Sequence, residues 1–186
     1  MSKELPIVGP GTILLAEPFM QESMFGRAVV LICHHDADGS FGLILNKPAA
    51  NPFQEDFENH PLRDFPFFAG GPVETNHMFF VHQLSYLTDS VFLKDGICWQ
   101  GDYDALLEAI EEQAFNPTNG RFLVGYSGWG EGQLEEELKG EDWMVYNGPI
   151  DDILKIDASD IWKHILQKMG PYYKMVSNFP TDPSLN

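Results

Sequence analysis

RAVVLICHHDADGSFGLILN, residues 27–46, consists of two apolar runs on either side of a polar turn. Asp38 and Gly39 are the strongest turn signal within it, because both residue types tolerate the backbone angles of tight turns. The centre of the first run shows no alternation of apolar and polar residues, which indicates a strand buried on both faces. We therefore predict an antiparallel hairpin with strands over Arg27–His35 and Phe41–Asn46.

Further strands and three helices are expected before and after this hairpin. Apolar runs predict strands at residues 12–16, 65–69, 78–82, 90–93, 97–100, 121–126 and 142–146. Asp102 is positioned to cap a helix that ends near residue 114, Ser159 to cap one that ends at Gly170, and residues 134–138 suit a short helix between them. This mixed order of strands and helices predicts an α+β or mixed α/β class.

The chain length of 186 residues is that of one domain. We expect this domain to span residues 1–177 and to be followed by a loose C-terminal tail, residues 178–186, which contains Pro180 and Pro183. Cys33 and Cys98 are expected to be buried reduced thiols, with a single disulfide as the alternative. The N-terminus lacks the apolar segment of a signal peptide, and no apolar run approaches the ~20 residues of a membrane span, so a cytoplasmic location is expected.

The formal net charge of −17 limits the partners of this chain. A field of this sign repels phosphate backbones and anionic lipids, and it favours basic partners. Only the lysines at 155, 163, 168 and 174 gather in one region, where nearby aspartates offset them, as on a solvated helix face. We therefore expect neither direct DNA binding nor a membrane partner.

The glycine-rich stretch Gly125–Gly132 could be a phosphate loop, a hydrolase nucleophile elbow or a structural turn. Its glycine spacing does not fit a dinucleotide loop, and the glutamates that follow would repel a phosphate at the helix N-terminus. An elbow requires glycine where Trp129 stands, so Ser127 is not expected to be a nucleophile. A compact structural corner is the favoured interpretation, with Trp129 and Leu134 anchoring it to the core.

A metal site is also not expected. Neighbouring strand residues point to opposite faces, so His34 and His35 cannot bind one ion together, whereas Cys33 and His35 would share a face as half a site. No Cys-x-x-Cys or His-x-x-x-His pair completes a tetrahedral set. We therefore predict a protein that folds without a metal, and no cofactor is indicated.

Four motifs are specific enough to indicate a family: LLAEPFMQESMFGRAVVLICHHDADGSFGLILNKP at 14–48, FAGGPV at 68–73, GYSGWGEGQLEEEL at 125–138 and DWMVYNGP at 142–149. Together they resemble the YqgE/AlgH family, bacterial proteins usually labelled transcriptional regulators. The resemblance implies a single α+β domain with a strongly bent, mixed or antiparallel, partly barrel-like sheet packed by helices. It implies no established enzymatic activity, and Ser127 stands where relatives often carry alanine.

The residues that match these motifs include six polar or aromatic side chains that could form a ligand or partner surface. These candidates are Arg27, His35, Asn46, Lys47, Trp129 and Gln133. No catalytic residue is assigned. The set is a hypothesis about position, since exposure and clustering in three dimensions decide whether such residues form one surface.

Three functional hypotheses follow. The main one is a cytoplasmic, non-enzymatic protein that acts as a transcriptional regulator through protein contacts or an unidentified small ligand. The first alternative is a hydrolase or metal-dependent enzyme with a polar site near His35, Asn46 and Lys47. The second alternative is direct nucleic-acid binding through the Lys155–Lys174 face.

Overall fold

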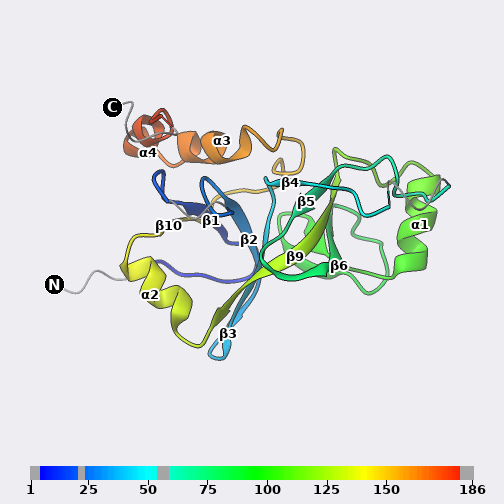
Figure 1. Cartoon of the computed structure of the whole chain (residues 1–186), viewed down its shortest axis with the longest axis horizontal. Helices are drawn as coiled ribbons and strands as arrows, with labels where there is room; N and C mark the ends of the chain where they lie inside the picture. The colour runs from blue at the N-terminus through cyan, green and yellow to red at the C-terminus, as the bar shows by residue number, and fades with distance from the viewer. Residues whose placement is uncertain (1–4, 21–23, 54–58, 181–186) are drawn as a thin grey trace.

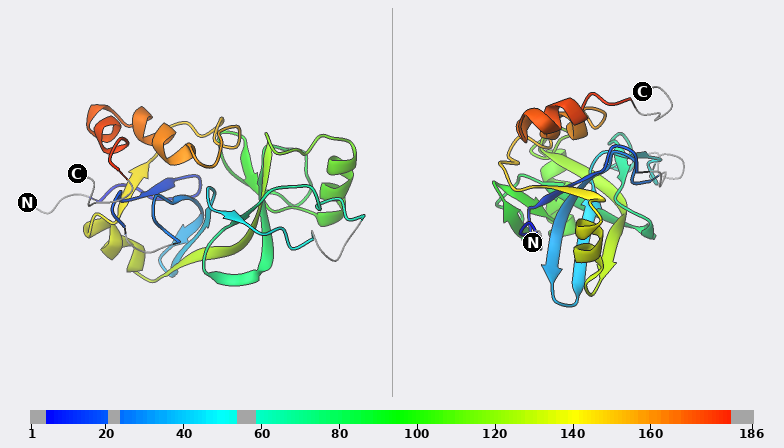
Figure 2. Two further views of the ribbon diagram at one scale, coloured as in Figure 1. Left: turned by 45° about the horizontal axis from the view of Figure 1, so that its top comes forward. Right: turned by 90° about the vertical axis from the view of Figure 1, so that its left-hand side faces the viewer.

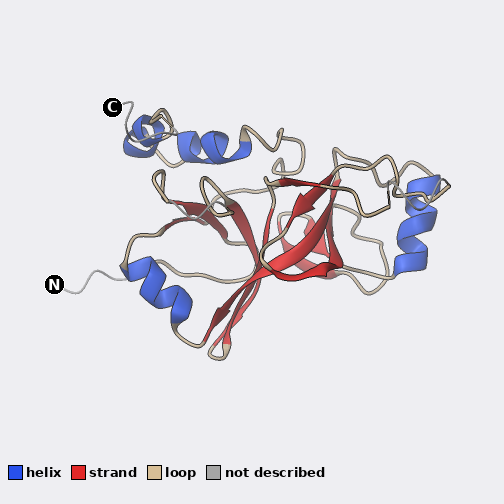
Figure 3. Cartoon of the chain, in the orientation of Figure 1, coloured by secondary structure: helices blue, strands red, loops and turns tan. Residues whose placement is uncertain are grey.

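The computed structural model describes residues 5–20, 24–53 and 59–180. These residues form one α+β domain, in which a bent sheet of ten strands is surrounded by four helices (Figure 1, Figure 3). The class agrees with the sequence prediction. The strands are β1 (Ile13–Ala16), β2 (Val29–Asp36), β3 (Gly39–Ile44), β4 (Pro48–Ala49), β5 (Phe67–Ala69), β6 (Val73–His82), β7 (Val91–Lys94), β8 (Ile97–Trp99), β9 (Gly120–Gly130) and β10 (Trp143–Tyr146). The helices are α1 (Tyr103–Glu111), α2 (Gln133–Lys139), α3 (Ile161–Lys168) and α4 (Pro171–Val176).

The predicted hairpin is confirmed. β2 and β3 pair antiparallel, from Val30 opposite Ile44 to Asp36 opposite Gly39. The turn is held by the Asp36 carboxylate, which accepts a hydrogen bond from the backbone N–H of Asp38. The distal half of the hairpin pairs with the end of β9, from Gly39 opposite Gly130 to Gly42 opposite Ser127, and α2 lies beside it (Figure 2).

A β-bulge in β2 corrects one expectation from the sequence. Ile32 pairs with Gly42 and His34 pairs with Phe41, so Cys33 is an extra residue on its strand. This insertion reverses the alternation of faces beyond it. Cys33 and His35 therefore lie on opposite faces and do not form half of a metal site.

The sheet runs in the order β10-β1-β2-β3-β9-β6-β8-β7, with β4 and β5 off this path. Most pairs are antiparallel, but β5 pairs parallel with β9, so the sheet is mixed. It bends until the β7–β8 turn approaches the segment after β10, where Lys94 Nζ donates to Asn147 O and Gly148 O. This approach gives the sheet its partly barrel-like form, although β7 and β10 do not pair and the sheet stays open.

The prediction of a compact corner at Gly125–Gly132 is wrong for most of that stretch. Residues 125–130 continue β9, and only Gly132, with φ of 70°, turns the chain into α2. Gly125 has φ of 71°, and a Cβ at Gly71 would lie 2.1 Å from the backbone of Tyr126. The glycines therefore permit a kink and a close approach between strands. The expected anchoring by Trp129 and Leu134 is confirmed, since both are buried.

Three apolar clusters hold the helices against the sheet. The first contains side chains of α3 and α4, the second lies beneath α2, and the third contains side chains of α1. α1 lies at one end of the molecule and the other helices at the opposite end (Figure 1). Asp102 caps α1 as predicted, because its carboxylate accepts from Ala105 N at 2.8 Å. Ser159 does not cap α3; the capping position is Asp160, without a side-chain bond.

The C-terminal part departs from the expected loose tail in its first residues. Phe179 packs against the first cluster and stacks on Phe19, with ring centroids 5.8 Å apart. Arg27 fastens the same residue by donating a hydrogen bond to its carbonyl oxygen. Residues 181–186 lie outside the described residues. Cys33 and Cys98 are both free and buried, as expected.

Candidate functional site

Three of the six candidate residues from the sequence support the start of β2. The Asn46 side chain accepts from Val29 N at 2.8 Å and donates to Arg27 O at 2.9 Å. Lys47 Nζ donates to Gly26 O, and partial burial lowers the pKa of this ammonium. Arg27 lies with its guanidinium carbon 4.9 Å from the centre of the Trp162 ring. These polar groups are therefore engaged with the backbone and with a core aromatic ring.

The other three candidates lie beside α2. His35 Nδ1 is 2.8 Å from Ser40 Oγ, and its Nε2 is 3.8 Å from the Glu135 carboxylate. Gln133 is exposed and donates to Glu137 Oε1 at 2.9 Å. Trp129 is buried, so it cannot form part of an exposed docking surface as proposed.

The structure thus divides the six residues into two groups. Arg27, Asn46 and Lys47 lie at the open end of the β2–β3 hairpin, whereas His35 lies near its turn. The shared polar site that the enzyme hypothesis requires is therefore not formed by His35, Asn46 and Lys47. Ser127 is also enclosed, with 1% of its surface exposed, and its hydroxyl donates to Gly70 O. Within the described ranges, no cluster of three or more His, Cys, Asp or Glu side chains could hold a metal ion.

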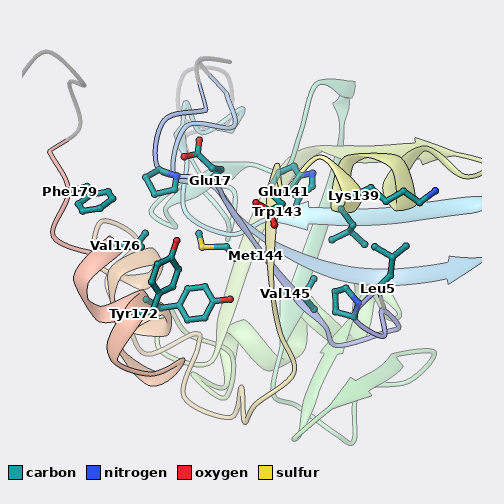
Figure 4. A pocket seen from close by; sticks show the side chains of 14 residues that line it. Leu5, Glu17, Lys139, Glu141, Trp143, Met144, Val145, Tyr172, Val176 and Phe179 are labelled. Atoms are coloured by element: carbon teal, nitrogen blue, oxygen red, sulfur yellow. The ribbon is translucent and has the colours of Figure 1, made fainter. Parts of the chain in front are cut away.

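A different feature, a groove of about 920 Å³, lies along the outer edge of β10 (Figure 4). Trp143, Met144 and Val145 of β10 form its floor. Tyr172 and Val176 of α4 lie on one side, and Leu5 and Lys139 lie on the other. The complete lining is Leu5, Pro6, Glu17, Pro18, Leu138, Lys139, Glu141, Trp143, Met144, Val145, Tyr172, Tyr173, Val176 and Phe179.

The backbone of β10 directs part of its hydrogen-bonding capacity into this groove. Among the strands described, β10 pairs only with β1, from Ile13 opposite Tyr146 to Ala16 opposite Trp143. Glu17 N donates to Asp142 O at 2.9 Å, so Glu17 and Asp142 are a hydrogen-bonded pair at the end of these two strands. In an antiparallel pair alternate residues bond to the partner, so Met144 and Tyr146 face β1. The N–H and C=O groups of Trp143 and Val145 therefore point outward.

The α4 wall is created by a break in the C-terminal helical region. Gly170 has φ of 116° and Pro171 follows as the first residue of α4, a combination that ends one helix and begins another. Val176 of α4 is buried against the core, while Tyr172 remains 66% exposed at the groove. The α4 side of the groove is therefore lined by apolar and aromatic side chains, and Val176 packs it against the core.

The α2 wall is held by one carboxylate. Glu137 Oε2 accepts hydrogen bonds from the indole N–H groups of Trp129 and Trp143, each at 2.7 Å. Leu134 and Leu138 of the same helix are buried in the second cluster. The helix therefore joins β9 to the edge strand and fixes the position of the groove side that it forms.

The sequence predicts the β10 strand but not the groove. The motif DWMVYNGP identified an apolar strand, and nothing local shows that this strand has only one neighbour. α4 was also missed, although Tyr172 and Tyr173 directly after Gly170 and Pro171 are a signal for a short helix with an exposed aromatic face. No helix in the described residues has the length and apolar character needed to cross a membrane.

Comparison with known proteins places this architecture in a family. A family model described as AlgH-like matches residues 13–174. A UPF0301 protein of Cytophaga hutchinsonii is 39% identical over 178 residues, which cover 95% of this chain and 98% of the relative. A UPF0301 protein of Parabacteroides distasonis is 39% identical over 189 residues, with 98% and 92% covered.

Two solved structures share the fold. A crystal structure of a Corynebacterium diphtheriae protein superposes with a TM-score of 0.74 at 24% identity, covering 96% of both chains. The solution structure of the AlgH protein of Pseudomonas aeruginosa has a TM-score of 0.72 at 20% identity, covering 97% of this chain and 98% of the other. With the family model spanning most of the sequence, these similarities show that the chain belongs to the AlgH-like family.

Proposed function

We propose that this protein acts by binding an apolar segment of a partner protein in the β10 groove, without catalysing a reaction. The observation that carries the proposal is a strand edge with outward-facing backbone groups, lying between two apolar walls (Figure 4). Large grooves lined by aromatic and aliphatic side chains with a few polar groups are the usual form of binding sites.

Two observations favour binding over catalysis. The polar residues that the sequence offered for chemistry are engaged in hydrogen bonds to backbone or to neighbouring side chains, as Asn46 and Lys47 are with the start of β2. The groove lining, in contrast, is mainly apolar and carries Glu17, Glu141 and Lys139 as its charged groups. Such a lining suits recognition of a peptide and offers no nucleophile paired with a base.

A role in transcriptional regulation would follow from such protein contacts and not from direct binding to DNA. The net charge of −17 opposes binding to a phosphate backbone. The same charge favours a basic partner. Lys168, on the alternative DNA-binding face, is already paired with Asp152 at 2.9 Å, which weakens that face as a phosphate site.

The test is selection of a displayed library of random short peptides on the immobilised full chain, followed by affinity measurement with variants. Tyr172→Ser removes a groove side chain that is 66% exposed, so the fold should be unchanged. Loss of one aromatic anchor should weaken binding of a selected peptide by about tenfold. Tyr86→Ser is the matched control, because Tyr86 is 65% exposed and does not line the groove.

Failure to enrich any peptide would refute the proposed function. Equal weakening by Tyr172→Ser and Tyr86→Ser would refute the assignment of the site. Circular dichroism melts of both variants serve to show that neither change acts through unfolding.

A further inference from the structure

We infer that the groove receives its partner as an added β-strand: an extended segment of another protein, apolar at its centre and carrying a basic residue, extends the sheet beyond β10. This inference rests on the proposed function and specifies how the groove binds. It differs from side-chain docking or from a helix lying in the groove, because main-chain hydrogen bonds to Trp143 and Val145 would carry much of the affinity.

The backbone geometry supports this mode. Trp143 and Val145 are two residues apart in a regular antiparallel register with β1, and this pair of strands shows no register shift. Their outward N–H and C=O groups therefore repeat at the spacing that an added strand requires. No hydrogen bond between the described residues uses these backbone groups.

The walls determine which side chains the added strand should carry. Trp143 and Val145 face the cluster beneath α2, whereas Met144 and Tyr146 face the cluster that contains α4. Alternate residues of a strand added beside β10 would therefore face α2 on one side and α4 on the other. Leu138 lines the first side and Tyr172, Tyr173 and Val176 line the second, so the added segment should be apolar on both faces.

Charge selects the partner further. The carboxylates of Glu17 and Glu141 lie near the Trp143 end of the groove (Figure 4). A lysine or arginine at the corresponding end of the segment would meet the Glu17 carboxylate, and the net charge of −17 would speed its approach. The same charge opposes a second copy of this chain as the occupant, since two copies would repel each other.

Backbone N-methylation of a peptide selected on the groove tests the mode directly. Each single methyl group removes one N–H and blocks pairing at that position. Strand addition predicts losses of about tenfold or more at every second position and little change between them, since only alternate N–H groups face β10. A flat response along the peptide, with binding retained, would overturn strand addition while leaving the proposed function intact. Absence of peptide binding would overturn both.

A proline at position 145 provides the complementary test from the protein side. The Val145 N–H faces the groove, so Val145→Pro removes a donor to the added strand without removing a bond to β1, and proline is tolerated on edge strands. Peptide affinity should fall about tenfold or more, whereas the control Val145→Thr should retain it. Unchanged affinity in a folded Val145→Pro protein would contradict the inference, and the N-methylation series decides the matter if that variant does not fold.

Amide hydrogen exchange identifies the occupant. In the free protein the amides of Trp143 and Val145 should exchange quickly and those of Met144 and Tyr146 slowly, and added peptide should protect the first pair. Protection of Trp143 and Val145 before peptide is added would show that this chain itself covers the edge. Light scattering then distinguishes a second copy, which would give a dimer, from a segment of the same molecule. Either result would overturn the inference.

Discussion

The two edges of the sheet, β10 and β7, have four residues each and opposite surroundings. β7 carries the more exposed apolar side chains, with Phe92 64% exposed, but it is interrupted by a register shift after Phe92 and ends in Lys94. A short, bulged, lysine-bearing edge is a common way to prevent further strand pairing. β10 shows no register shift, and its side chains are largely covered while its backbone faces a groove between helices. Exposed hydrophobic area alone therefore does not identify a binding edge.

The largest expected difference between the edges is in stability. Trp143 is 6% exposed, packs edge-on against Phe25 and Trp129, and donates to Glu137. Trp143→Ala should reduce the free energy of unfolding by about 3–5 kcal/mol. Phe92→Ala on the other edge should change it by about 0.5 kcal/mol or less. Chemical denaturation measures both, and similar losses at the two edges would contradict the comparison.

A smaller effect is expected from Glu137, which connects α2 to the β10 edge. Glu137→Ala leaves two indole N–H groups without their acceptor and should reduce the free energy of unfolding by about 2 kcal/mol. It should also weaken peptide binding, because the α2 wall loosens. Glu136→Ala, one residue away, removes only an exposed pair with Lys139 and should have no measurable effect on either property. Equal behaviour of the two variants would exclude Glu137 as the link.

Acid should act at the β7 end before it acts at the groove. His82 is fully buried, its Nδ1 accepts from Leu84 N, and its Nε2 donates to Gln100 O, so the folded protein holds it neutral. Burial lowers the pKa of His82 below its ordinary value. The unfolded chain therefore binds a proton more readily, and stability that is complete above about pH 6.5 is lost as the pH falls below that value.

This dependence can be measured as the free energy of unfolding of wild type and variants between about pH 7 and pH 5. His82→Gln should be less stable at neutral pH and show a shallower decline in acid. His77→Gln is the control, because His77 is exposed and should leave the wild-type slope unchanged. Peptide affinity should vary little over the same range, since no histidine lines the groove. A steep loss of peptide affinity in acid, with an unchanged free energy of unfolding, would instead place the acid-sensitive group at the groove.

The smallest expected effect concerns the lysine-bearing face of α3 and α4. Duplex DNA should bind the isolated chain with a dissociation constant of ~10⁻⁴ M or weaker at physiological salt. Lys163→Glu should therefore leave both the weak DNA affinity and the peptide affinity unchanged. A salt-titrated shift assay that gave sub-micromolar affinity, lost in Lys163→Glu, would restore the nucleic-acid hypothesis.

The predictability of the site differs from that of the fold. The hairpin, the capping of α1 and the strand at β10 follow from local signals, and all three are present in the structure. The candidate residues Arg27, Asn46 and Lys47 were identified as polar members of a motif, but their partners are backbone groups that the sequence does not reveal. Trp129 is one of the candidate surface residues, but it is buried because α2 folds back over it. Its position depends on the partner in Glu137, eight residues later.

The sequence by itself determined the α+β class, the central hairpin and the acidic character of the protein. These properties depend on apolar periodicity, turn residues and charge, which act over a few residues or over the whole composition. Only the tertiary structure decided that the bulge at Cys33 separates it from His35, that Arg121 is buried and donates to Leu45 O and Ile156 O, and that β10 ends the sheet beside α4. Such features depend on contacts between segments far apart in the chain, and no local pattern encodes how many neighbours a strand will have.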